Sequence, residues 1–357
     1  MKKLLALVLS LSLALALLAG CGQQTAEPEE ATEATAAEET AEAPETGDLQ
    51  TIVFSEPIRG YHWAPAYLAQ TLGYFEEEGL TAEFQTITGG APHAAIFSGD
   101  ADFTLAGIEM ALTAAEAGQG CKIVLSTTQK YPYQLIGANE SYSDMESLRG
   151  GVIAGGQGAT SAPQAFARAC LQASGMTAET DASVITMASP AYAAAIASGE
   201  IQAAISTNPW SAKMLVDNGG VVIVDGTDDA VIEQMIGSAS YELFAVITAD
   251  ATIEKDPEMV QKAVNAMYKA MKWMETATPE EIAQQLLPLF EGAEEELLYD
   301  AQYDKEREVA NYTGLHTETG YAAGLAMSKL SGAITQDFPA DQIYDESFVE
   351  NAAQNAE

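Results

Sequence analysis

Residues 88–107, TGGAPHAAIFSGDADFTLAG, decide the fold of this chain. They predict a Gly-Gly turn, a short helix, a second turn at SGD (98–100) and then a buried strand. The second half of the stretch recurs one hundred residues later as AIASGEIQAAI over 195–205. A helix, turn and strand that occur twice in one chain indicate two similar lobes. A ligand between the lobes would explain why both apolar runs end in polar or glycine-containing loops.

Strand-like and helix-like segments alternate on both sides of this stretch. Such alternation is typical of an open α/β sheet with right-handed crossovers, whose ligands lie beyond the carboxyl ends of the strands. The pattern falters over 134–147, and the run 241–247 predicts a strand that returns to the first half. Strands are predicted at 51–54, 81–87, 103–106, 123–127, 152–154, 183–187, 203–205, 220–225 and 241–247, and helices at 66–72, 109–117, 162–173, 257–275, 279–287, 294–309 and 320–330.

The sequence therefore predicts an α/β fold with two Rossmann-like lobes joined by two chain crossings. Lobe 1 is expected over 51–138 and 240–357, and lobe 2 over 139–239. The helices that follow Asp256 are expected to cover the faces of lobe 1.

The first twenty residues have the pattern of a signal peptide, with a basic front at Lys2 and Lys3 and a short apolar segment over 4–17. The segment ends in LAGC (18–21), which resembles the lipobox of bacterial lipoproteins. In that class the cysteine carries diacylglycerol and becomes the new N-terminus, so the resemblance implies a membrane anchor at Cys21. The alternative is an ordinary buried cysteine at the end of a secreted leader.

Residues 21–50 are expected to form a tether, because they are mostly Ala, Thr, Glu and Pro, with no aromatic side chain and no basic one. The whole chain has a formal net charge of −37. So acidic a surface excludes nucleic acid and anionic lipid as partners, since both require a basic footprint. Two cysteines follow the tether, Cys121 and Cys170, and they are expected in different lobes. We interpret them as small buried residues; the alternative is a disulfide between the lobes.

Candidate ligand contacts are the residues that follow each predicted strand. Trp63 and Tyr61 could stack on a flat ring, with the alternative that these rings only wedge the loop against lobe 1. The loop GGQGATS (155–161) opens a helix whose free N–H groups could hold a polar group, although a tight turn without a ligand is an equal reading. No Lys follows these glycines, so the loop is not a nucleotide-binding phosphate loop. No cofactor or metal site is predicted. The candidates are Tyr61, His62, Trp63, Gly89, Gly90, Ala106, Gly107, Gly158, Thr160, Ser161, Asn208 and Trp210.

Few basic residues accompany these candidates. Arg59 and Lys130 are the two near the predicted pocket, and an oxyanion would call for such a cation or for converging N–H groups. Aromatic and amide groups outnumber charges, which favours an uncharged or heteroaromatic ligand. His93 and Tyr192 are weaker candidates, expected at the surface.

Six segments together resemble the SsuA/THI5-like substrate-binding proteins, the NMT1 family. The segments are PAYLAQ (65–70), GYFEEEGL (73–80), GG (89–90), SGDADF (98–103), SGEIQAA (198–204) and DPEMV (256–260). The resemblance covers about residues 51–275. Gln202 departs from the family's usual Asp, with little expected consequence because Asp102 holds the equivalent place in the first repeat.

The resemblance implies a type II periplasmic-binding-protein fold with a hinge, and delivery of a small molecule to the permease subunits of an ABC importer. The protein would be a monomer, outside the cytoplasm and anchored to the bacterial membrane. The family's ligands include alkanesulfonates, taurine, nitrate and pyrimidine precursors of thiamine. Two alternatives stay open: a ligand sensor for a membrane signalling partner, and an enzyme like the fungal pyrimidine synthases, whose cysteine-rich motif this chain lacks.

Overall fold

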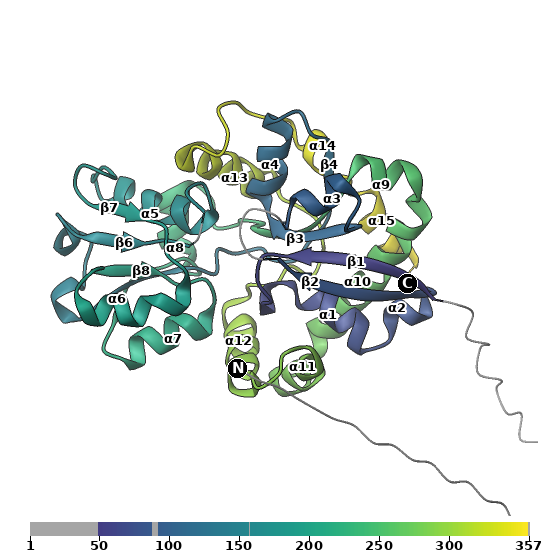
Figure 1. The fold of residues 1–357 in the computed structure, drawn as a ribbon, viewed down its shortest axis with the longest axis horizontal. Coiled ribbons are helices and arrows are strands. Elements are labelled where there is room, and N and C mark those ends of the chain that lie inside the picture. The colour runs from purple at the N-terminus through teal and green to yellow at the C-terminus, as the bar shows by residue number, and fades with distance from the viewer. Residues whose placement is uncertain (1–48, 88–91, 157, 356–357) are drawn as a thin grey trace, which may run out of the picture. The chain divides into compact units, whose positions relative to one another are not determined.

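The computed structural model describes residues 49–87, 92–156 and 158–355. Within them, two five-stranded sheets form the framework, with strand orders β2-β1-β3-β10-β4 and β7-β6-β8-β5-β9 (Figure 1). We call the first sheet with its packed helices lobe 1 and the second lobe 2. The strands are β1 (Gln50–Glu56), β2 (Leu80–Thr86), β3 (Phe103–Gly107), β4 (Cys121–Ser126), β5 (Gln134–Gly137), β6 (Val152–Ala154), β7 (Ser183–Ile185), β8 (Ala203–Ile205), β9 (Val221–Asp225) and β10 (Phe244–Ala249).

Each sheet contains one antiparallel strand, and that strand connects the lobes. β10 runs antiparallel between β3 and β4, which confirms the predicted return to the first lobe. β5 runs antiparallel between β8 and β9. The sequence interpretation missed β5 because its four residues are too few for a periodic signal and begin with the polar Gln134, which is nonetheless buried. The mixed sheets confirm the two-lobed α/β prediction, although β5 pairs in the sheet of lobe 2 and not in lobe 1, whose expected span ran to residue 138.

Helices follow most strands, and the predicted ones are present within a few residues. The helix predicted at 162–173 coincides with the observed one, because a proline at its start and a glycine after its end mark both limits. The helices are α1 (Ala64–Thr71), α2 (Tyr74–Glu77), α3 (Ala94–Ser98), α4 (Ile108–Glu116), α5 (Ala162–Ala173), α6 (Tyr192–Ser198), α7 (Pro209–Asp217), α8 (Asp229–Ile236), α9 (Asp250–Lys255), α10 (Pro257–Thr276), α11 (Pro279–Leu286), α12 (Glu294–Arg307), α13 (Glu318–Ser331), α14 (Ala340–Ile343) and α15 (Ser347–Asn355).

Helices cover both faces of the first sheet, with α3, α4, α13 and α14 on one side and α1, α2, α10 and α11 on the other (Figure 1). The prediction that the C-terminal helices belong to lobe 1 alone is incomplete. α12 also contacts α7 of lobe 2, and α13 contacts α5. The C-terminal part of the chain therefore reaches the second lobe from two directions.

The core of lobe 1 is aromatic at its centre. Phe54 of β1 stacks on Phe103 of β3 at 5.0 Å and on Phe84 of β2 at 5.1 Å between ring centroids. Phe54 and Phe103 are fully buried. These contacts fix the three strands whose ends carry the candidate ligand residues.

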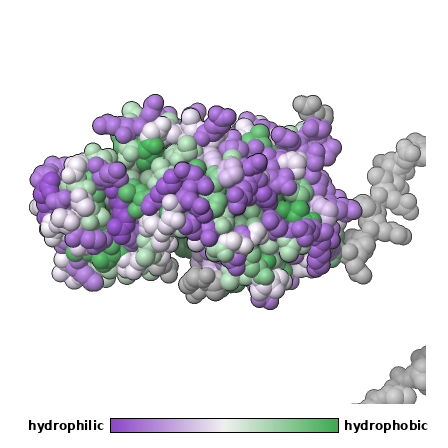
Figure 2. Space-filling view, turned by 90° about the horizontal axis from the view of Figure 1, so that it is seen from above, coloured by the Kyte–Doolittle hydropathy of each residue, from purple (hydrophilic) through white to green (hydrophobic). Residues whose placement is uncertain are grey.

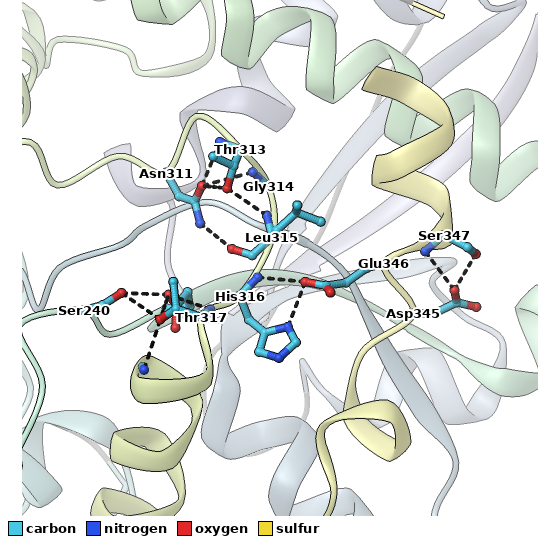
Figure 3. Close-up of polar contacts among 12 residues, drawn as sticks. Ser240, Asn311, Thr313, Gly314, Leu315, His316, Thr317, Asp345, Glu346 and Ser347 are labelled. Atoms are coloured by element: carbon cyan, nitrogen blue, oxygen red, sulfur yellow. Dashed lines mark hydrogen bonds and ion pairs between the residues drawn. The ribbon is translucent and has the colours of Figure 1, made fainter. Parts of the chain in front are cut away.

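A hydrogen-bonded loop ties the C-terminal segment to lobe 1 (Figure 3). The side chain of Asn311 accepts the backbone N–H groups of Thr313 and Gly314 at 2.8 and 3.0 Å. The imidazole of His316 lies 2.8 Å from the carboxylate of Glu346, and its hydrogen bond with that carboxylate raises the pKa of the imidazole. α13 follows this loop, and the side chain of Thr317 caps its start by accepting the N–H of Gly320 at 3.1 Å.

Hydrophilic residues cover most of the face shown in Figure 2, and hydrophobic residues form smaller separate groups. No helix within residues 49–87, 92–156 and 158–355 is long and apolar enough to cross a membrane. Cys121 and Cys170 are buried free thiols, which confirms that interpretation. The leader, Cys21, the tether up to residue 48 and the Gly89-Gly90 pair lie outside the described residues.

Candidate functional site

A cavity of about 710 Å³ lies at the carboxyl ends of the parallel strands of both lobes. Lobe 1 contributes the loop after β1 and the junction of β3 with α4, and lobe 2 contributes the loops after β6 and β8. Tyr133 and Phe244, on the two segments that connect the lobes, also line the cavity. Its volume lies in the range of small-molecule pockets, and its place is where open α/β sheets bind ligands.

Most of the described candidate residues line this cavity. They are His62, Trp63, Ala106, Gly107, Gly158, Thr160, Ser161 and Asn208. The cavity therefore brings together residues from four separate segments, each at or just after the end of a strand.

The wall from lobe 1 is aromatic. The imidazole of His62 stacks on Phe244 at 4.3 Å, and the indole of Trp63 meets the same ring edge-on at 5.2 Å. His62 Nε2 lies 2.8 Å from the backbone carbonyl oxygen of Thr207 in lobe 2, so this side chain also joins the two lobes. Burial lowers the pKa of His62 to about 4, although the Thr207 carbonyl opposes the shift. His62 is therefore neutral at physiological pH.

The wall from lobe 2 is a glycine-containing loop that is stabilised by hydrogen bonds from Tyr192 and Gln164. Gly156 has a positive φ of 66° and donates its N–H to the hydroxyl of Tyr192 at 3.0 Å. The side-chain amide of Gln164 donates to the carbonyl of Gly155 at 2.7 Å. Tyr192 is thus a buried support of the loop, and its expected surface position is wrong.

Ser161 of the same wall is the N-cap residue of α5. Its hydroxyl donates to the Gly158 carbonyl at 2.7 Å instead of capping the helix. The hydroxyl therefore stabilises the turn of the loop.

Trp210 and Tyr61 lie away from the large cavity. The segment predicted as a loop begins α7, where Asn208 and Ser211 form a reciprocal capping box. This turns the ring of Trp210 toward Tyr299 of α12, at 5.9 Å between ring centroids. Tyr61 lines a crevice of about 20 Å³, and its hydroxyl donates to Asp304 at 3.3 Å.

The lobes also meet where α12 approaches the start of α7. Asp300 accepts the backbone N–H of Trp210 at 2.8 Å, and Asn208 donates to Glu296 at 3.0 Å. Burial raises the pKa of Asp300 well above its usual range. We call these residues the α7–α12 contact.

Arg59 and Lys130, the two basic residues expected near the pocket, form hydrogen bonds and ion pairs with other parts of the protein. The three nitrogen atoms of the Arg59 guanidinium donate to Glu56 and to the carbonyls of Phe84 and Leu289 at 2.9–3.2 Å. Lys130 does not line the cavity and pairs with Asp229 at 2.9 Å. No basic side chain among the described residues therefore offers a free cation to the cavity.

His93 differs from its expected position. The expectation that it faces solvent is wrong, because it lines the cavity. Burial lowers its pKa to about 4. Like His62, it is neutral at physiological pH.

Glu109 lines the cavity and was missed by sequence reasoning. It stands in the first turn of α4, directly after β3. Its Oε2 is sealed from water and has no hydrogen-bond partner among the described residues. An acidic residue two positions after the end of a central strand was the available signal, because such positions face the ligand edge of the sheet.

The sequence profile described as NMT1/THI5 like matches residues 61–282. The chain belongs to the NMT1/THI5-like family. Comparison with curated proteins gave no match. A solved structure from Bordetella bronchiseptica is similar at a TM-score of 0.68 and 23% identity, covering 87% of this chain and 98% of the other.

Two further solved structures share the fold of this NMT1/THI5-like chain. One is a putative periplasmic sulfonate-binding protein SsuA of an ABC transporter from Methylobacillus flagellatus, with TM-score 0.64, 20% identity and coverage of 87% and 95%. The other is the desulfurization enzyme DszB, with TM-score 0.55, 16% identity and coverage of 86% and 100%. With its two mixed sheets, the chain has the type II periplasmic-binding-protein fold.

Proposed function

We propose that this chain is an extracytoplasmic solute-binding lipoprotein that captures a small molecule and delivers it to the permease subunits of an ABC importer. Family membership and a cavity of about 710 Å³ between the lobes support the proposal. The protein acts as a monomer and is anchored to the bacterial membrane through Cys21.

A heteroaromatic molecule, such as a pyrimidine precursor of thiamine, is favoured over sulfonate, taurine or nitrate. The observation that carries this choice is the cavity wall of Trp63, Tyr133 and Phe244. Flat rings pack well against such faces. The oxyanions would need a cation, and the Arg59 guanidinium is occupied within lobe 1.

An enzyme remains the alternative because the desulfurization enzyme DszB has the same fold. In this chain the two described cysteines are poor nucleophiles, since burial raises the pKa of the Cys121 thiol to about 12 and also raises the pKa of the Cys170 thiol. Neither of them lines the cavity. These observations favour binding without turnover. A ligand sensor would use the same cavity and differs only in its membrane partner.

A thermal-shift panel of pyrimidines, flavins, sulfonates, taurine and nitrate tests the proposal. A bound ligand raises Tm because it stabilises the folded state by mass action. We expect pyrimidines or flavins to raise Tm. Turnover of any compound, with no compound raising Tm, would overturn the binding-protein proposal.

Trp63→Phe separates a ring contact from a general loss of folding. It keeps an aromatic face and avoids the cost of about 3–5 kcal/mol that truncating a buried Trp to Ala entails. Affinity for a heteroaromatic ligand should fall about 10-fold, because the smaller ring offers less surface for stacking. Trp273→Phe is the matched control, because Trp273 lies on α10 and does not line the cavity. Equal affinity in both variants would contradict the role of Trp63.

A further inference from the structure

The charged side chains that line the cavity in the described residues are Arg59 and Glu109. The Arg59 guanidinium is turned into lobe 1, where its donors meet Glu56 and two carbonyls. His62 and His93 also line the cavity, and burial lowers the pKa of both to about 4, so both are neutral. Glu109 therefore provides the one unpaired charge that this part of the cavity can offer a ligand.

The carboxylate of Glu109 lies over the start of its own helix. The N-cap residue of α4 is Gly107, which has no side chain to cap the helix. A Cβ atom at Gly107 would lie 2.2 Å from Oε2 and 2.6 Å from Oε1 of Glu109, so the glycine makes room for the carboxylate. The residue as a whole is half-buried, whereas Oε2 is sealed from water.

No cation balances this carboxylate within the described residues. Burial raises the pKa of Glu109 to about 7, and the backbone N–H groups of Glu109 and of Ala162 at the start of α5 act in the opposite direction. The other titratable groups beside it are the phenols of Tyr131, Tyr133 and Tyr241, whose raised pKa values include a contribution from its charge. A buried acceptor without a partner destabilises the folded protein, so a ligand that donates to this carboxylate offsets that cost.

A second unpaired polar atom belongs to another residue of the cavity wall. Nε1 of Trp63 is buried and has no hydrogen-bond partner among the described residues. Two residues of the cavity wall thus each hold one buried polar atom without a partner, an acceptor on α4 and a donor in the segment before α1. Buried polar atoms are usually paired in folded proteins. Nine buried side-chain atoms of the described residues have no partner, and these two are the ones whose residues line the cavity, which is why we connect them with a ligand.

We propose that Glu109 selects the charge of the ligand. The ligand carries a cationic or N–H-donating nitrogen that pairs with the carboxylate, and a flat ring that lies against Trp63 and Phe244. An oxyanion would instead face the carboxylate without a free cation. This inference rests on the proposed binding function and narrows its ligand class.

Charge-matched pairs of ring compounds test the selection. Tryptamine with indole-3-acetate, and benzamidine with benzoate, keep the ring and reverse the charge. Thermal shift and calorimetry are measured on the wild type, Glu109→Gln and the control Glu116→Gln. Glu116 stands on the same helix, accepts the N–H of Thr335 at 3.2 Å and does not line the cavity.

We expect only the cationic members to raise Tm. Glu109→Gln should weaken their binding by about 10- to 100-fold, the usual worth of a hydrogen bond to a charged group, and Glu116→Gln should leave it unchanged. Binding of an anionic or neutral compound with no cationic one would overturn the inference and leave the binding function standing. Turnover without any binding would overturn the binding function itself. Cation affinity retained in Glu109→Gln would overturn the inference by assigning the carboxylate a structural role only.

The pH profile separates ligand contact from a structural role. Tryptamine and benzamidine stay protonated between about pH 6 and 8, where amines and amidines of high pKa keep their charge, and the neutral His62 and His93 do not titrate there. A cation binds the ionised carboxylate, so affinity should fall as pH drops through about 7, by up to about 10-fold one pH unit below. The profile should be flat in Glu109→Gln. A flat profile in the wild type would contradict the pairing.

Discussion

The turns that precede β3 and β8 are built with the same hydrogen bonds. In lobe 1 the hydroxyl of Ser98 donates to the Ala95 carbonyl at 3.2 Å, and in lobe 2 the hydroxyl of Ser198 donates to the Ala195 carbonyl at 3.0 Å. Gly99 and Gly199 adopt left-handed conformations with φ of 81° and 77°. The repeat seen in the sequence is therefore a repeat in structure.

Asp102 and Gln202 hold equivalent positions after the two turns, and each accepts a hydrogen bond from a neighbouring strand. Asp102 accepts the N–H of Val53 in β1 at 2.9 Å, and Gln202 accepts the N–H of Val152 in β6 at 2.8 Å. The expectation that Gln202 is of little consequence agrees with this geometry, because either side chain supplies the oxygen. Lobe 1 uses a charged acceptor where lobe 2 uses a neutral one.

The two lobes differ where their strands end. β3 runs straight into α4, whose N-cap is Gly107 and whose first turn carries Glu109 toward the cavity. β8 is followed by a loop that ends at Asn208, which caps α7 and bonds to Glu296. Both helix starts border the cavity, but the start of α4 carries an unpaired carboxylate there, whereas the start of α7 also holds the lobes together through Glu296. The place of each helix start in the fold, and not its origin in the repeated sequence, therefore decides its role.

The hydrogen bonds that Asp102 and Gln202 accept should give the largest difference in stability between variants of the two lobes. Asp102→Ala should lower the free energy of unfolding by about 2 kcal/mol, and Gln202→Ala by about 1 kcal/mol, because hydrogen bonds to charged acceptors contribute more. Urea denaturation measures both. Asp102→Asn and Gln202→Asp keep an oxygen acceptor and should recover most of the loss. A larger loss of unfolding free energy in Gln202→Ala than in Asp102→Ala would contradict this difference between the lobes.

The α7–α12 contact should depend on the shape of Asp300 more than on its charge. Asp300→Ala leaves the N–H of Trp210 without its acceptor, at an expected cost of about 1–2 kcal/mol. We expect a larger radius of gyration in small-angle scattering as the lobes separate. Asp300→Asn should behave like the wild type, because burial raises the pKa of Asp300 and favours its neutral form. Equal opening in both variants would contradict this assignment.

The two left-handed glycines should respond alike. Gly99→Ala and Gly199→Ala should each cost about 1 kcal/mol, because a Cβ is disfavoured at positive φ. Asn tolerates this conformation better, so Gly99→Asn and Gly199→Asn should cost less. Thermal unfolding compares the four variants. Unequal Ala penalties would show that the turns are alike only in geometry.

Glu109 should give the smallest effect on the ligand-free protein. Its raised pKa means that the folded state holds the proton, so its contribution to stability is full below its usual pKa and is lost as pH rises through about 7. The Tm of Glu109→Gln relative to the wild type should therefore rise by about 1–3 °C between about pH 5 and pH 8. A constant difference across this range would mean that the carboxylate does not titrate there.

Much of the fold was readable from local patterns. The hydrophobic pattern and the turn residues located α5, β6 and β8 to the residue. For α5 the signals were Pro163 near its start and Gly175 after its end. Trp63 was identified through its place after a strand. β5 was missed because a four-residue strand gives little periodic signal. α7 was missed although Asn208 and Pro209 are a helix-start signal of the kind that located α5.

The sequence by itself determined the two-lobed α/β architecture and its repeated turns, because hydrophobic period and glycine placement are local properties. Only the tertiary structure decided which candidates share a cavity. It turned Trp210 toward α12, engaged the donors of Arg59 within lobe 1, and left Glu109 facing the cavity without a cation among the described residues. Whether a charge is paired depends on residues far apart in the chain, such as Arg59 and Leu289, so no local pattern can state it.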